Sequence, residues 1–179
     1  MSLEKNYFAW FNLSNQFFLN ETHLKKKFFE LSRELHPDFH TQADDATKES
    51  MLEKSVQNTQ AYKTLMEFDS RMKYILELEN VLNDENKNAL PSDFLMEMMD
   101  LNEEVDDAQF SKDNGRVQIL KNKLEQLKSE FLDEAKPAML AYDADNSTIS
   151  ALDSVRLYYL KKRYLLRLED NLKGVLPDM

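Results

Sequence analysis

The chain has 179 residues, 42% of them hydrophobic, which is enough to bury one substantial core or two smaller ones. Its formal net charge of −10 argues against binding to nucleic acid or to an anionic membrane, because both usually require a basic surface. The lack of cysteine excludes disulfides, thiolate metal ligands and a cysteine nucleophile. We therefore expect a chain that folds by packing alone and that has proteins as its partners.

Neither a secretory leader nor a membrane span is predicted. The first residues, MSLEKNYFAWFNL, lack the charged start, the long apolar run and the small-residue cleavage site of a signal peptide. No later stretch approaches eighteen consecutive apolar residues. We therefore expect a cytoplasmic protein without a membrane partner.

Few turns of the kind that β-strands need are available, because the chain has only two glycines and four prolines, and an all-α fold is predicted. A short helix is expected around residues 7–13. Asn20 is suited to cap a second helix. The apolar residues of this second helix recur at the spacing of one helical face: Leu24, Phe28, Leu31 and Leu35.

A third helix is predicted over roughly residues 46–66, antiparallel to the second. Its expected buried stripe consists of residues at helical spacing: Leu52, Val56, Thr59, Tyr62 or Lys63, and Met66. The helical pattern continues over residues 69–82. The polar run NDENKNALPS then predicts a linker over residues 83–92, which separates an N-terminal domain (1–82) from a C-terminal domain (93–179).

The C-terminal domain is predicted to be a three-helix bundle. Its helices are expected over residues 92–108, 112–142 and 147–173. Pro137 is expected to kink or end the middle helix, because proline lacks a backbone donor and clashes with the preceding turn. The middle helix carries apolar residues at heptad-like spacing: Val117, Leu120, Leu124, Leu127 and Phe131.

The stretch LHPDFH, residues 35–40, interrupts the helical pattern between the second and third helices. Pro37 fixes its own φ and disfavours the helical conformation at His36, so the helix must end there and Asp38 is presented on a loop. The preceding helix carries basic residues off its apolar stripe: Lys25, Lys26, Lys27 and Arg33. A carboxylate next to a basic face suits a docking surface, although helices also stop before proline without any function.

The His-Pro-Asp tripeptide after a basic helix, with SVQNTQAYKTL on the next helix, resembles a J-domain. This resemblance implies an antiparallel helix pair whose tip docks on a DnaK-class chaperone and stimulates its ATP hydrolysis. The implied contacts are the tripeptide and the basic face: His36, Pro37, Asp38, Lys25, Lys26, Lys27 and Arg33. Phe39 departs from the J-domain pattern, in which a basic residue commonly follows the tripeptide. The resemblance therefore does not imply a charge contact with the chaperone at this position.

The second motif is SDFLMEMMDLNEEVDD, residues 92–107. It resembles the helix by which HscB-type J-proteins bind the iron–sulfur scaffold protein IscU, and with it the resemblance covers the whole chain. Proteins of this family pair an N-terminal J-domain with a C-terminal three-helix bundle, deliver the scaffold to the chaperone HscA, and hold no cluster themselves. The resemblance therefore implies an HscA-like chaperone and an IscU-type scaffold as partners, no cofactor and no enzymatic activity.

Helical geometry predicts two different faces on this second motif. One narrow stripe suits the bundle core: Phe94, Met98, Leu101 and Val105. The residues pointing away from it combine apolar and acidic side chains and form the predicted scaffold contact: Leu95, Met96, Met99, Asp100, Glu103 and Asp107. The competing interpretation is a helix buried on two sides, with its methionines as core filler. Tyr159 on the last helix is a further scaffold contact that the resemblance implies.

Two other functions are compatible with parts of the sequence. His36, Asp38 and His40 are possible metal ligands or acid–base groups, but their spacing is irregular and no further cluster of histidine or cysteine supplies a fourth ligand. We therefore expect no metal site. A J-domain protein with a different client would share the first motif but not the second.

Overall fold

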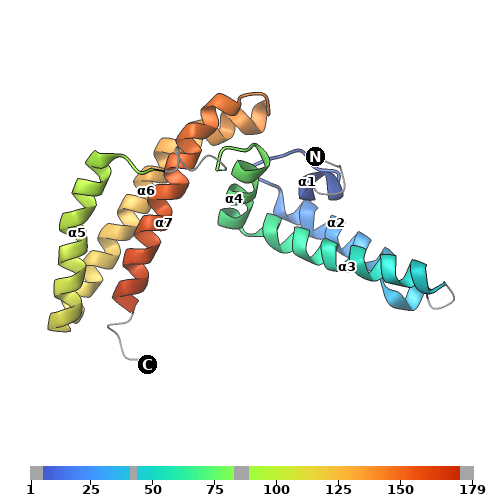
Figure 1. Ribbon diagram of the computed structural model, residues 1–179, viewed down its shortest axis with the longest axis horizontal. Coiled ribbons are helices and arrows are strands. Elements are labelled where there is room, and N and C mark those ends of the chain that lie inside the picture. The colour runs from blue at the N-terminus through green and yellow to red at the C-terminus, as the bar shows by residue number, and fades with distance from the viewer. Residues whose placement is uncertain (1–5, 41–43, 83–88, 174–179) are drawn as a thin grey trace. The chain divides into compact units, whose positions relative to one another are not determined.

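The computed structural model describes residues 6–40, 44–82 and 89–173, and every regular element in these ranges is helical (Figure 1). The predicted all-α fold is therefore confirmed for this part of the chain. None of the helices described here is long and apolar enough to cross a membrane. The linker predicted over residues 83–92 falls largely outside the described residues, since 83–88 are not described, and its boundaries stay a prediction.

The chain divides into two compact units. One comprises residues 1–79 together with 143–146, and the other comprises residues 80–142 and 147–179. Within the first unit, the carboxylate of Asp143 accepts hydrogen bonds from two consecutive backbone N–H groups, those of Phe17 at 2.6 Å and Phe18 at 2.9 Å.

The elements of the first unit are, in chain order, α1 (Tyr7–Trp10), α2 (Glu21–Glu34), the short 3₁₀ helix η2 (Pro37–His40), α3 (Asp45–Met66) and α4 (Phe68–Leu78). Asn20 caps α2 as predicted, because its side chain accepts a hydrogen bond from the backbone N–H of His23 at 2.9 Å. α2 and α3 pack side by side and run antiparallel (Figure 1). Their connection places the His-Pro-Asp tripeptide at one end of the pair.

A buried amide joins α3 to both α1 and α2. Asn58 donates from Nδ2 to the Ser32 hydroxyl at 2.9 Å and to the Phe28 carbonyl at 3.3 Å. Its Oδ1 accepts a hydrogen bond from Trp10 Nε1 at 3.0 Å. The ring of Phe28 also stacks on Tyr62 of α3, with the ring centroids 4.1 Å apart. These contacts satisfy polar groups that would otherwise be buried without partners.

The buried stripe predicted for α3 is wrong in part. Leu52, Val56 and Thr59 are exposed, and Tyr62 and Met66 are only partly buried. The fully buried side chains of α3 are instead Asn58, Ala61 and Leu65. A pattern that searches for large apolar residues misses this face, because two of its three fully buried residues are the polar Asn58 and the small Ala61.

A buried arginine closes the C-terminal end of α3. Arg71 of α4 donates from Nη1 to the carbonyls of Leu65 and Met66 and from Nε to the carbonyl of Phe17 at 3.0 Å. Carbonyls in the last turn of a helix lack helical partners, so Arg71 supplies the donors that this turn needs. Burial lowers the pKa of Arg71 below its ordinary value, which reflects the cost of placing a cation in the interior.

The second unit contains α5 (Ser92–Ser111), α6 (Asn114–Ala144) up to residue 142, the short 3₁₀ helix η4 (Ile149–Ala151) and α7 (Leu152–Lys173). Its three long helices form the predicted bundle (Figure 1). The bundle core contains all four residues predicted for the α5 stripe and the first three of the heptad-like series on α6, and Leu127 and Phe131 pack against it. α7 adds Leu165, Leu168 and Leu172 to this core.

Pro137 does not end α6, which continues to Ala144. Ala135, Met139 and Tyr142 are buried on either side of the proline. Their packing holds both segments in the unit and outweighs the cost of about 3 kcal/mol that proline imposes on a helix interior. An ion pair between Lys128 and Glu169, with Nζ and Oε2 2.9 Å apart, further ties α6 to α7.

We expect Asn58→Leu to lower the free energy of unfolding of the first unit by about 1 to 3 kcal/mol, because it leaves Trp10 Nε1 and the Ser32 hydroxyl without their buried partner. Trp10 is the one tryptophan of the chain, so urea unfolding followed by its fluorescence measures the effect. Thr59→Ala, one position along α3 on the exposed side, is the control. Equal midpoints for the two variants would show that the Asn58 hydrogen bonds contribute nothing.

Candidate functional site

The tip of the α2–α3 pair is a tight turn that follows the end of α2. α2 ends at Glu34 with Leu35 as its C-terminal cap, so the predicted helix end before Pro37 is confirmed. The backbone then turns through η2, where the N–H of Phe39 donates to the carbonyl of His36 at 3.0 Å. The side chains of Pro37 and His40 lie outside the described part of the structure.

His36 orients this turn, and Asp38 projects from it. The backbone N–H of Asp38 donates to Nδ1 of His36 at 3.2 Å, so the imidazole ring is tied to the backbone of the turn. The Asp38 carboxylate lies 3.6 Å from the same nitrogen, and 84% of its side chain is exposed. The tip therefore presents a carboxylate to solvent on a turn that is held by backbone and imidazole contacts.

A groove at the tip is lined by residues of α2 and of the turn: Phe29, Ser32, Arg33, His36, Asp38 and Phe39. Phe29 and Phe39 are both exposed, and the Phe39 ring meets the His36 ring edge-on with centroids 6.3 Å apart. Phe29 was not predicted as a site residue, although its position off the apolar stripe of α2 was a usable signal. The tip thus combines two exposed aromatic rings with the charged side chains of Arg33 and Asp38.

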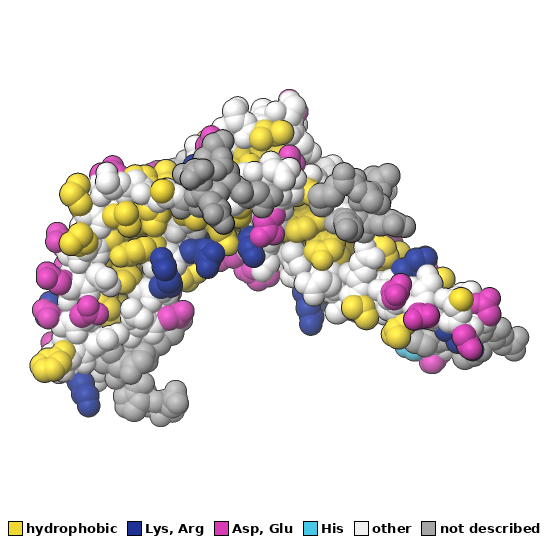
Figure 2. Space-filling model, in the orientation of Figure 1, with side chains coloured by type: hydrophobic (Ala, Val, Ile, Leu, Met, Phe, Trp, Pro, Cys, Tyr) yellow, Lys and Arg dark blue, Asp and Glu magenta, His cyan; other side chains and the backbone are white. Residues whose placement is uncertain are grey.

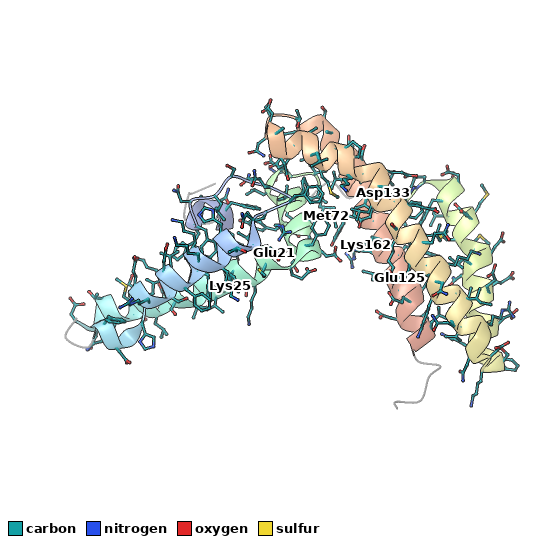
Figure 3. All side chains as sticks on the ribbon, turned by 180° about the vertical axis from the view of Figure 1, so that it is seen from behind. Glu21, Lys25, Met72, Glu125, Asp133 and Lys162 are labelled. Carbon is teal, nitrogen blue, oxygen red and sulfur yellow. The ribbon has the colours of Figure 1, made fainter. Side chains whose placement is uncertain are left out.

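On the basic face of α2, Lys25, Lys26 and Arg33 are exposed and Lys27 is partly buried; Lys25 is labelled in Figure 3. Lys26 and Lys27 place their Nζ atoms 4.0 and 3.8 Å from the carboxylate of Glu30. Such exposed pairs contribute at most about 1 kcal/mol, so both lysines can exchange Glu30 for a partner's carboxylate at little cost. Arg33 lines the groove together with His36 and Asp38, whereas the lysines lie about two turns earlier on the helix.

α5 presents apolar side chains to solvent on the side away from the bundle core. Leu95, Met96 and Met99, named here the α5 patch, are 40%, 64% and 67% exposed. The competing interpretation of a helix buried on two sides is therefore wrong for these residues. Figure 2 shows hydrophobic and acidic side chains interspersed over this helix.

The predicted acidic edge of the α5 patch is also exposed. Asp100, Glu103 and Asp107 all reach solvent. Asp107 is partly neutralised, because its Oδ2 lies 3.6 Å from Nη2 of Arg116 on α6. Asp100 and Glu103 are therefore better placed than Asp107 to meet a basic partner.

Tyr159 is placed differently from the α5 patch. Its side chain is only 8% exposed, and the Arg163 guanidinium lies 5.8 Å from the ring centroid. It therefore offers a partner little surface, and its predicted scaffold contact stays a prediction.

The metal alternative rests on His36, Asp38 and His40. Among the described residues, no group of three His, Cys, Asp or Glu side chains is arranged to hold a metal ion. The side chain of His40 is not part of that description, so this alternative is not tested.

Comparison with known proteins supports the description of both units. Residues 90–173 match the protein family described as "HSCB C-terminal oligomerisation domain". A co-chaperone protein HscB homolog from Paraburkholderia phymatum is 32% identical over 120 residues, which are 66% of this chain and 69% of that protein. The chain belongs to the HscB co-chaperone family.

Other HscB proteins extend the similarity to nearly the whole chain. An HscB homolog from Shewanella halifaxensis is 26% identical over 95% of this chain and 96% of its own length. The solved HscB structure from Vibrio cholerae has a TM-score of 0.67 and 24% identity, covering 95% of this chain and 96% of that one. The human HscB structure has a TM-score of 0.72 and 24% identity, covering 95% and 81% respectively.

These structures show the fold of the HscB-family chain. It has an N-terminal J-domain, in which the antiparallel α2–α3 pair is packed with short helices, followed by a C-terminal three-helix bundle. The predicted fold class and the predicted HscB-type resemblance are both confirmed. The HscB proteins that this chain resembles are co-chaperones rather than enzymes in the usual sense.

We expect Phe39→Ala to weaken binding of the HscB-family protein to its chaperone partner by roughly tenfold, because an exposed ring that becomes buried in an interface carries a large share of its energy. Biolayer interferometry with the immobilised chaperone measures this. Leu52→Ala, which removes a similarly exposed apolar side chain from α3, is the control. Phe39→Lys separates the chemistry: wild-type affinity in this variant would mean that a charge serves as well as the ring.

Proposed function

We propose that this HscB-family protein binds an IscU-type iron–sulfur scaffold protein and delivers it, in the cytoplasm, to a DnaK-class chaperone of the HscA type whose ATPase it stimulates. The observation that carries this proposal is the presence of two exposed surfaces of different chemistry on separate units. One is the charged and aromatic tip of the first unit, and the other is the α5 patch of the second.

The tip supports the chaperone arm of the proposal. Asp38 is exposed on a turn that is ordered by the His36 ring, so its carboxylate reaches a partner without refolding the loop. A carboxylate held in this way forms a charge-assisted hydrogen bond with an arginine or lysine of the chaperone. The lysines of α2 and Arg33 then meet acidic groups on the same partner, and the two signs of charge fix the orientation of docking.

The α5 patch supports the scaffold arm. Its residues stand on a helix whose opposite face is anchored in the bundle core, so the patch is presented by a rigid element. Methionine adapts its shape to a partner surface, and exposed apolar side chains rimmed by carboxylates are typical of a protein interface. Asp100 and Glu103 favour a scaffold with a basic surface, and they speed association most at low ionic strength.

The two arms together make a bridging co-chaperone. A scaffold held on the second unit is brought to the chaperone that the first unit contacts, so the local concentration of scaffold near the chaperone rises without any new contact between those two proteins. The HscB-family protein itself needs no catalytic group for this role. The scaffold's iron–sulfur cluster is cargo in this scheme.

We expect Asp38→Asn to reduce stimulation of the chaperone ATPase at least tenfold while the melting temperature stays unchanged, because the substitution removes the charge from an exposed side chain and keeps its size. A steady-state ATPase assay and thermal unfolding measure the two quantities. Glu53→Gln removes one charge from an exposed position of α3 and is the control. Undiminished stimulation by Asp38→Asn would contradict the proposed contact between the tip and the chaperone.

We expect combined replacement of Leu95, Met96 and Met99 by alanine to weaken scaffold binding by about 2 to 4 kcal/mol, because the change removes the apolar contact area but keeps a high helix propensity. Calorimetry with the purified scaffold measures this, and Leu140→Ala, an exposed apolar position on α6, is the control. Stimulation of the chaperone by the triple variant alone should persist. The extra stimulation that scaffold and co-chaperone produce together should disappear.

Unchanged scaffold affinity in the triple variant would contradict the scaffold arm and leave a co-chaperone for another client. A large fall in its melting temperature would also contradict it, since it would show that the three side chains serve the core.

A further inference from the structure

Phe110 is the most exposed of the large hydrophobic side chains that the structure describes, with 93% of it accessible. It lies in the last turn of α5, and Lys112, with φ 53°, ends the helix in the left-handed conformation. This turn is well anchored. Ala108 is fully buried in the bundle core, and the Gln109 side chain donates to the carbonyl of Asn171 on α7 at 2.6 Å. Phe110 is therefore held in solvent by a rigid turn.

Phe110 shares a helix face with the α5 patch. Phe110 follows Met99 by eleven residues, so at 3.6 residues per turn the two side chains point within about 20° of each other. At 1.5 Å per residue, they are about 16 Å apart along the helix axis. The exposed side chains on the same face between them are acidic: Glu103, Asp106 and Asp107.

We propose that Phe110 is a second apolar anchor of the scaffold interface, three turns from the α5 patch and separated from it by carboxylates. This inference rests on the proposed scaffold binding described above. It specifies the partner surface further: two apolar depressions about 16 Å apart, with basic side chains between them. A single exposed phenylalanine has no such meaning by itself, and it is the alignment with Met96 and Met99 on one rigid helix that gives Phe110 this role.

The charge of this face selects the partner. In a symmetric contact, a second copy of the chain would bring the same acidic stripe, Glu103, Asp106 and Asp107, against itself. Like charges placed opposite each other across an interface cost several kcal/mol. A basic scaffold surface, in contrast, meets the carboxylates with opposite charge at the same time as it covers the two apolar positions.

The test measures scaffold affinity of full-length variants by calorimetry. We expect Phe110→Ala to weaken binding roughly tenfold and Phe110→Leu to retain most of the wild-type affinity, because the anchor needs apolar volume. Ile119→Ala, at a 68% exposed apolar position on α6, is the matched control and should bind as wild type. The effects of Met99→Ala and Phe110→Ala should multiply, since sites more than about 10 Å apart act independently. The melting temperature and chaperone binding of Phe110→Ala should equal those of wild type.

The outcomes separate this inference from the proposed function. If Phe110→Ala binds the scaffold as wild type while the triple variant of the α5 patch does not, Phe110 is no anchor and the scaffold site is confined to the patch. If the triple variant also binds as wild type, the proposed function itself fails. An equal loss in Ile119→Ala would overturn the inference, and so would a change of oligomeric state in analytical ultracentrifugation of Phe110→Ala without a change in scaffold affinity.

Discussion

The J-domain of this protein depends on one buried amide. Asn58 donates to α2 through the Ser32 hydroxyl and the Phe28 carbonyl, and it accepts the indole N–H of Trp10 from α1. Apolar contacts alone tolerate sliding of one helix against another, whereas a buried hydrogen-bonding group is satisfied at only one register. The register of the α2–α3 pair, at whose end the tip lies, therefore follows from hydrogen bonds in the interior.

In the second unit, a single helix has to meet two structural requirements. α5 has to pack against α6 and α7 and also to display apolar side chains, and its sequence separates these tasks by angle around the helix. Phe94 and Met98 face the core, while Met96 and Met99, one or two positions away, face solvent. Carboxylates separate the exposed apolar groups of this face from one another. One helix thus combines a face that is fixed in the core with an exposed apolar face.

Sequence reasoning was most successful where periodicity and local chemistry act together. The cap at Asn20, the helix end before Pro37 and the two faces of α5 were all predictable, because each depends on neighbours in sequence. It failed where tertiary contacts decide. The polar Asn58 was not recognisable as a core residue, because its hydrogen-bond partners lie on other helices. Phe110 was missed because exposure of a large ring becomes meaningful only when its neighbours in space are known, whereas the position of Phe29 off the apolar stripe of α2 was a signal that was not used.

The exposed turn from His36 to Phe39 has a consequence for how such a protein evolves. Its exposed side chains contribute little buried area, so most substitutions there change folding stability by no more than about 0.5 kcal/mol. Selection for a stable fold removes destabilising variants, so it has little effect on these positions. Under the proposed function, the chaperone partner constrains them instead. If the docking surface of the chaperone changes, substitutions at the tip can restore the contact without affecting the fold. Phe39, which stands where J-domains commonly have a basic residue, is such a difference. Asn58 and Arg71 are constrained separately, by the packing of the core.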